Sequence, residues 1–152
     1  MHVRLADLAA TETFAAYLGR HLRKGDLVAL HGDLGVGKTA LARQIIRTLG
    51  DRPDEEVASP TFNLVLVYAF PQITIWHFDL YRIGAPEETW ELGLEDALAE
   101  GIALVEWPER MGSLLPVDRI DIALKYDGTG RIAEVSGLGA CADRVATWRW
   151  PA

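Results

Sequence analysis

The 152-residue sequence has few of the features that mark exported or membrane proteins. Its single cysteine, Cys141, cannot form a disulfide within the chain, which fits a reducing compartment. The longest apolar run, from Leu64 to Phe70, is seven residues, whereas a membrane-spanning helix needs about 20. The first residues include Asp7 and no apolar core typical of a signal peptide. We therefore expect a soluble, cytoplasmic protein without membrane contacts.

Basic residues are fewer than acidic ones. There are 15 Lys and Arg against 22 Asp and Glu, which gives a net charge of −7 and a pI near 5.0. This balance disfavours DNA binding by phosphate neutralisation, and any RNA contact would need a basic surface from another subunit. Residues 87–109 hold eight of the acids and no Lys or Arg. That segment is either a solvated helix face or a surface that docks a basic partner.

No repeat or low-complexity linker divides the chain, and its length suits one domain spanning residues 1–152. Apolar periodicity predicts a helix over 11–23 capped by Thr11, a buried strand over 27–30 and a helix ending at Gly50. Further along, the pattern predicts a hairpin (64–70 and 73–78), a helical stretch interrupted at Gly93 (86–98), a buried strand (102–105) and antiparallel strands around a turn (120–124, 127–130 and 132–135).

The strongest motif follows the strand at 27–30. Residues 32–39 read GDLGVGKT and match G-x-x-x-x-G-K-[ST], a loop whose backbone N–H groups wrap nucleotide phosphates. Glycine lets the loop bend tightly and approach the anion, and the N-terminus of the following helix attracts negative charge. The predicted phosphate-binding residues are Gly32, Asp33, Leu34, Gly35, Val36, Gly37, Lys38 and Thr39.

Within this loop, we expect Lys38 to reach the β- and γ-phosphates and the Thr39 hydroxyl to bind magnesium. The motif needs a strand before it and a helix after it, and the sequence predicts both. A glycine turn that contains Lys and Thr by accident would rarely have this context. The sequence thus predicts an α/β P-loop NTPase, a three-layer αβα fold with a mainly parallel central sheet and antiparallel strands in the C-terminal third.

Two acids close apolar runs and are candidates for the magnesium shell. Glu106 follows the clean run 102–105, so its carboxylate should emerge at the carboxyl end of a central parallel strand, where ligands bind in such sheets. Asp79 follows 73–78, a run interrupted by polar residues and preceded by a hairpin. We favour Glu106 for the metal and Asp79 for positioning or activating water. The reverse assignment, or a purely structural strand-end acid, stays open.

Three further residues near these acids are ambiguous. Thr61 lies where nucleotide switches place a hydroxyl that senses magnesium and the γ-phosphate, yet an ordinary loop threonine fits almost as well. His77, between two aromatic residues, is best interpreted as a hydrogen-bonded structural histidine. The only asparagine, Asn63, is not followed by the Lys-x-Asp of guanine-binding proteins, so ATP is the default ligand.

The chain resembles the TsaE (YjeE) family in the order and spacing of several segments. These are HGDLGVGKT (31–39), SPTF (59–62), HFDLYR (77–82), PEETWELGLED (86–96), VEWPER (105–110) and Leu115-Pro116. The family comprises small bacterial ATPases of tRNA threonylcarbamoyladenosine synthesis, and the resemblance spans roughly residues 10–135. It implies Mg-ATP hydrolysis in support of the TsaD and TsaB proteins, which form threonylcarbamoyladenosine beside the anticodon. Contact with tRNA would be indirect, through that complex.

The resemblance also implies residue roles. Lys38 and Thr39 look like the phosphate and magnesium ligands, Glu106 like the second magnesium residue, and Asp79 like a residue needed for hydrolysis. Thr61 resembles the switch threonine and Trp107 the tryptophan beside the active site, although Trp107 could equally fill the core or its rim. By similarity, Thr11 and Arg131 contact the nucleotide.

Two other functions compete with such an ATPase. A small-molecule kinase can also be built on a short P-loop domain, but residues 83–109 lack the arginine-bearing lid that kinases usually carry over the phosphates. A nucleotide-dependent binding module with negligible turnover is the second alternative. Steady ATP hydrolysis without an acceptor would distinguish the ATPase from both.

Overall fold

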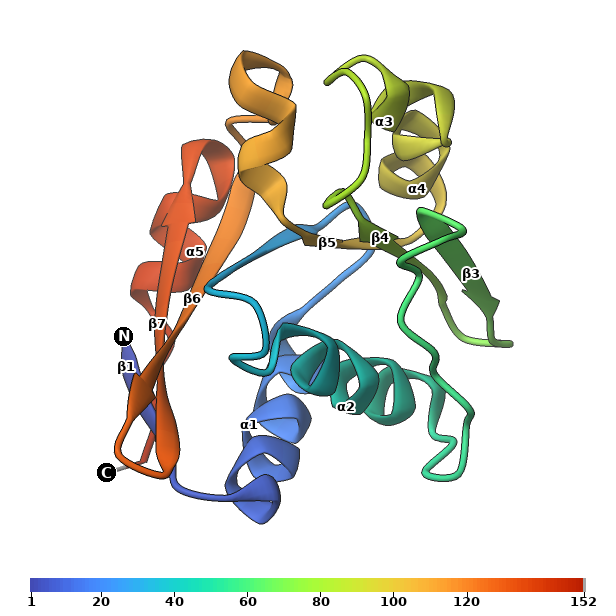
Figure 1. The fold of residues 1–152 in the computed structure, drawn as a ribbon. Coiled ribbons are helices and arrows are strands. Elements are labelled where there is room, and N and C mark those ends of the chain that lie inside the picture. Colours follow the sequence, from blue (N-terminus) through green and yellow to red (C-terminus); the bar gives the residue numbers. More distant parts are fainter. Residues whose placement is uncertain (152) are drawn as a thin grey trace.

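The computed structural model describes residues 1–151, and these contain one seven-stranded sheet (Figure 1). The strand order is β1-β7-β6-β2-β5-β4-β3. The strands are β1 (His2–Leu5), β2 (Leu27–His31), β3 (Val65–Ala69), β4 (Thr74–Asp79), β5 (Ile102–Glu106), β6 (Arg119–Asp127) and β7 (Gly130–Leu138). The central strands β6, β2, β5 and β4 are parallel, whereas the pairs β3–β4, β6–β7 and β1–β7 are antiparallel. This topology confirms the predicted fold class.

Helices cover both faces of the sheet. Figure 1 shows α1 and α2 together on one side and α3 and α4 on the other. The helices are α1 (Leu8–His21), α2 (Lys38–Gly50), α3 (Glu88–Glu91), α4 (Leu94–Glu100) and α5 (Ala142–Ala146), with 3₁₀ segments η1 (Pro108–Leu114) and η2 (Gly139–Cys141). No helix within residues 1–151 is long and apolar enough to cross a membrane.

The short apolar strand β2 explains the two-sided core. Successive side chains of a strand point to opposite faces. Val28 and Leu30 pack in the core formed with α1 and α2, while Leu27 and Ala29 pack in the core on the side of α4. A strand buried on both faces must be apolar throughout, which is why the run 27–30 lacks alternation.

The first helix begins earlier than the sequence predicted. Its cap is Asp7, whose side chain accepts a hydrogen bond of 2.9 Å from the backbone N–H of Ala10. The prediction of Thr11 as cap is wrong because the extended Asp7 caps the helix one turn earlier, and the Thr11 amide already donates to the Asp7 carbonyl at 3.2 Å inside the first turn. The Thr11 hydroxyl instead donates to the Asp7 carbonyl at 3.3 Å, inside the first turn.

Parallel pairing brings the predicted site elements to one edge of the sheet. Asp79, the last residue of β4, lies opposite Glu106, the last residue of β5. Glu106 is in turn aligned with Leu30 of β2, just before the glycine-rich loop. Because the carboxyl ends of β2, β4 and β5 coincide, the loop and both acids lie together.

Candidate functional site

The glycine-rich loop adopts backbone conformations that other residues rarely reach. Gly32, Gly35 and Gly37 have φ of +146°, +81° and +117°. A Cβ added to Gly32 would lie 2.7 Å from Val36 Cγ1 and 2.8 Å from the Leu124 carbonyl oxygen. A Cβ on Gly37 would meet no described atom within 4 Å and would project into open space. The loop is therefore a glycine cradle: packing leaves no room for a Cβ at Gly32, and the backbone at Gly37 faces open space.

Lys38, the first residue of α2, is 4% exposed and turned back over the loop. Its ammonium donates to the Gly32 carbonyl and lies 3.3 Å from the centre of the Trp107 ring. Burial lowers the pKa of Lys38, and the carboxylates of Glu106, Glu109, Asp79 and Asp33 oppose that shift. An ammonium has three N–H donors, and the Gly32 carbonyl takes one of them, so Lys38 has donors left for an incoming anion.

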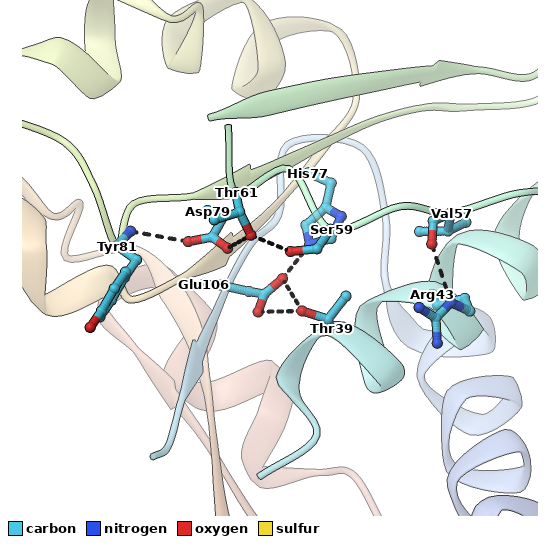
Figure 2. Close-up of polar contacts among 9 residues, drawn as sticks. All are labelled: Thr39, Arg43, Val57, Ser59, Thr61, His77, Asp79, Tyr81 and Glu106. Atoms are coloured by element: carbon cyan, nitrogen blue, oxygen red, sulfur yellow. Dashed lines mark hydrogen bonds and ion pairs between the residues drawn. The ribbon is translucent and has the colours of Figure 1, made fainter. Parts of the chain in front are cut away.

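Thr39 and Glu106 are in direct contact. The Thr39 hydroxyl is 2.8 Å from Glu106 Oε1 and 3.0 Å from Oε2. Figure 2 shows His77 at the same carboxylate, with Nε2 2.6 Å from Oε2. Glu106 is 2% exposed, so these two side chains replace the water that would normally solvate it.

Asp79 belongs to a second chain of hydrogen bonds. Its Oδ1 accepts the backbone N–H of Tyr81 at 3.0 Å, and its Oδ2 accepts the Thr61 hydroxyl at a longer 3.4 Å. Thr61 Oγ1 lies 2.7 Å from Ser59 Oγ (Figure 2). One acid thus contacts the P-loop threonine Thr39, and the other contacts the loop after α2.

Two cavities meet at the start of α2, where Gly37 and Ala40 line both. The first, about 210 Å³, contains the two acids and the cation; its residues are Leu34, Gly35, Gly37, Lys38, Thr39, Ala40, Ser59, Thr61, Asp79, Glu106 and Trp107. The second, about 230 Å³, is lined by Leu5, Ala6, Asp7, Leu8, Thr11, Val36, Gly37, Ala40, Leu41, Leu124, Thr129, Gly130 and Arg131. The two cavities could hold a long ligand with a polar end and a less polar end.

Arg131 joins the second cavity to the loop. Its Nε donates to the Val36 carbonyl at 2.7 Å, and its guanidinium lies 4.3 Å from the centre of the Tyr126 ring. Thr11, more than a hundred residues earlier in the chain, lines the same cavity. The structure thus brings together the two residues that only the family resemblance had suggested.

Trp107 is held in a strained backbone conformation, with φ 57° and ψ 49°. For a non-glycine residue this left-handed region costs roughly 1–2 kcal/mol, and such strain clusters at functional sites. The indole contacts Tyr81 at a ring-centre distance of 5.0 Å as well as Lys38. Trp107 is half-buried at the cavity wall and does not lie in the interior of the core.

The remaining predicted residues have distinct places. Asp33 and Leu34 are exposed at the tip of the loop, Leu34 at 72%, and only Leu34 lines the first cavity. Two residues near the acids had no role in the sequence-based prediction of the site: Ser59 lines the first cavity, and His77 bonds Glu106. Ser59 stands two positions before Thr61 in the SPTF segment, and that spacing was the available signal.

A separate charged group lies where β2 and β6 run side by side. His31 Nε2 is 3.0 Å and Arg119 Nε 2.9 Å from Asp121 Oδ1. Burial raises the pKa of Asp121, but the hydrogen bonds and charges of His31 and Arg119 outweigh it and lower that pKa overall. The group fixes the last residue of β2, from which the glycine-rich loop begins.

Comparisons with known proteins agree with this architecture. A family model described as "Threonylcarbamoyl adenosine biosynthesis protein TsaE" matches residues 5–133. Among curated relatives named tRNA threonylcarbamoyladenosine biosynthesis protein TsaE, that of Rickettsia bellii is 45% identical over 127 residues, covering 83% of this chain and 88% of the relative. The Nostoc relative of the same name is 36% identical over 150 residues, covering 94% and 90%.

The crystal structure of Bacillus subtilis YdiB has the same fold, with a TM-score of 0.77 over 96% of this chain and 90% of that one. At 24% identity, that likeness supports the fold alone. The family model covers the glycine-rich loop, both strand-end acids and Trp107. The chain belongs to the TsaE family, which acts in tRNA threonylcarbamoyladenosine biosynthesis.

Proposed function

We propose that this protein is a magnesium-dependent ATPase that supports TsaD and TsaB in forming threonylcarbamoyladenosine in tRNA. The observation that carries the proposal is the contact between Thr39 and Glu106 beneath a bare glycine cradle. A hydroxyl and a carboxylate are the oxygen ligands that Mg²⁺ accepts, and such sites usually hold the ion together with nucleotide phosphates. The donor set therefore fits Mg-ATP.

The chain's own residues divide the work of binding. Backbone N–H groups of the cradle, with the N-terminus of α2, hold the phosphate oxygens. Lys38 leaves the Gly32 carbonyl and the Trp107 ring to bond the β- and γ-phosphates. Magnesium bound at Thr39 and Glu106 would neutralise charge that develops on the phosphates. Between the two candidate acids, the Thr39 contact supports Glu106 for the metal.

Asp79 is then free for the attacking water. Its Oδ1 is fixed by the Tyr81 amide, while the long Thr61 contact to Oδ2 is weak enough to be exchanged for a water molecule. Thr61 and Ser59 follow α2 on a loop that reaches the same cavity. We propose that Asp79 orients or deprotonates the water and that Thr61 senses the γ-phosphate.

The second cavity is the proposed place of the adenosine. Gly37 links it to the cradle, and its lining is mostly apolar, as a nucleoside site requires. Thr11 offers a hydroxyl, and the Arg131 guanidinium, already stacked on Tyr126, can contact the nucleoside. We propose ATP over GTP because the sequence lacks the Asn-Lys-x-Asp motif of guanine-binding proteins.

The decisive experiment measures phosphate release from ATP by the wild type and by Asp79→Asn. Loss of one well-placed polar group in such a site typically costs about 10²- to 10³-fold in rate. We expect Mg-dependent release by the wild type, and Asp79→Asn should lose that much activity while ATP binding is retained. Equal rates for both proteins would remove Asp79 from the mechanism.

The same assay separates the alternatives. A kinase would transfer the phosphate to an acceptor, so a phosphorylated metabolite would appear when extract metabolites are added. A binding module would bind ATP but release no phosphate in either protein, even with TsaD and TsaB present. Phosphate release without an acceptor supports the ATPase.

The partner proposal has its own test. Glu87, Glu91 and Glu95 are exposed around α3 and α4, whereas the Glu88 carboxylate bonds the Gly84 amide at 3.1 Å. Lys substitutions at the three exposed positions should weaken co-purification with TsaD and TsaB and leave ATP binding intact, because complementary charge governs assembly. Unchanged co-purification would make this acidic segment only a solvated face.

A further inference from the structure

The imidazole of His77 is completely buried, and its one hydrogen-bond partner within residues 1–151 is Glu106. His77 lies two residues before Asp79 on β4, so both side chains project from the same face of that strand. Asp79 is directly opposite Glu106, which places His77 diagonally across from Glu106. The pairing of β4 with β5 therefore aims the imidazole at the carboxylate.

The direction of this hydrogen bond follows from the chemistry of the carboxylate. An ionised carboxylate only accepts hydrogen bonds, so Nε2 of His77 donates to Oε2 across 2.6 Å. Nδ1 is buried without a partner in the described chain. A ring protonated at Nε2 alone leaves only a lone pair unmatched there, and leaves no N–H without an acceptor. The geometry thus fits an imidazole that serves the carboxylate and nothing else.

Thr39 and His77 contribute differently to holding Glu106. Thr39 has one hydroxyl proton and spans both carboxylate oxygens at 2.8 and 3.0 Å. The Thr39 oxygen is itself a proposed metal ligand, so its bond to Glu106 lies within the metal site. The bond from His77 involves no metal ligand other than Glu106 itself, and it can stay in place throughout.

Resting on the proposed function, we infer that His77 is a positioning residue for Glu106: it fixes the carboxylate in the orientation that Mg-ATP requires. A structural histidine would serve only packing, and a leucine could then replace it among the apolar residues on that face of the sheet, such as Ile75 and Leu104. A positioning histidine must supply an N–H at the place of Nε2. The two roles make different demands on the replacement side chain.

Three variants separate these roles. His77→Gln can place its amide N–H near the position of Nε2, His77→Asn has a shorter side chain that cannot, and His77→Leu carries no donor. The probe is ATP labelled on its ribose with a fluorescent methylanthraniloyl group, titrated first in EDTA and then with increasing MgCl₂. The titration in EDTA measures nucleotide affinity of the cradle without metal. The MgCl₂ series measures how strongly that affinity depends on the metal site.

Removing a hydrogen-bond partner behind a metal ligand typically weakens metal affinity by about 10- to 100-fold. We expect His77→Leu and His77→Asn to raise the MgCl₂ concentration at half-saturation by that factor with unchanged affinity in EDTA, and His77→Gln to restore it. If His77→Leu does not fold, the comparison of Gln with Asn decides. Equal Mg²⁺ dependence in wild type and Asn, or equal loss in Gln and Asn, would overturn the inference while the proposed function stands. A wild type without Mg-dependent nucleotide binding would overturn both.

Discussion

Alanine substitutions at three glycines test whether the cradle works as bare backbone. Gly37 has φ 117° and ψ 18°, and Gly93, between α3 and α4, has φ 103° and ψ 25°. An added Cβ meets nothing within 4 Å at either position. The two sites are therefore matched in conformation and in space, but only Gly37 lies in the cradle.

The expected losses of stability follow from the backbone and from packing. A side chain in these conformations costs about 1 to 3 kcal/mol, so Gly37→Ala and Gly93→Ala should lose similar amounts of unfolding free energy. At Gly32 the added Cβ also presses on Val36 and on the Leu124 carbonyl, which adds about 1 to 3 kcal/mol of overpacking. Gly32→Ala should therefore be the least stable of the three.

Urea unfolding without nucleotide measures these losses, and a titration with labelled ATP measures binding. We expect Gly37→Ala to weaken ATP binding and Gly93→Ala to bind like the wild type, although both lose comparable stability. Equal ATP affinity for the two variants would refute the role of bare backbone in the cradle. Equal stability of Gly32→Ala and Gly37→Ala would refute the predicted overpacking at Gly32.

Three more predictions concern charged groups. Because Lys38 must leave the Trp107 ring to reach phosphate, Mg-ATP should change the tryptophan fluorescence, and Trp107→Phe should abolish the change; persistence of the full signal in that variant would contradict this. Burial holds the pKa of Lys38 below 10.5, so the protonated lysine destabilises the folded state, and this cost disappears as pH rises towards 10.5. The urea concentration at the unfolding midpoint should therefore increase over this pH range in the wild type and not in Lys38→Met. For Asp121, the pKa is below 3.8, so its stabilising bonds to His31 and Arg119 are present above pH 3.8 and are lost as pH falls through the folded-state pKa. Asp121→Asn should cost about 1 to 3 kcal/mol at neutral pH and flatten the acid side of the stability profile, and an unchanged profile would count against it.

Local patterns made most of the fold predictable. The glycine-rich loop is a contiguous motif, and the short apolar runs of β2 and β5 suited strands buried on both faces, which the structure confirms. Because strand ends are readable, the proximity of Asp79 and Glu106 to the loop followed from parallel pairing. The first residue of α1 could not be predicted, because Asp7 and Thr11 are both residue types that cap helices well and the sequence does not decide between them.

Contacts that depend on strand register were not predictable. The pairing of β1 with β7 joins strands more than a hundred residues apart in the sequence, and no local signal specifies it. The bond from His77 to Glu106 requires knowing that β4 aligns with β5 so that Asp79 faces Glu106. The left-handed backbone of Trp107 is likewise invisible in the sequence, because a tryptophan there breaks the usual preference for glycine.

The central claim is that Thr39 and Glu106 form a magnesium site that acts with the glycine cradle on ATP. Calorimetric titration of ATP, with and without Mg²⁺, into wild type and Glu106→Gln tests it most directly. The account predicts that Mg²⁺ strengthens ATP binding to the wild type and that Glu106→Gln loses this gain while retaining metal-free binding. ATP binding to the wild type that does not depend on Mg²⁺, or an undiminished gain in Glu106→Gln, would contradict it.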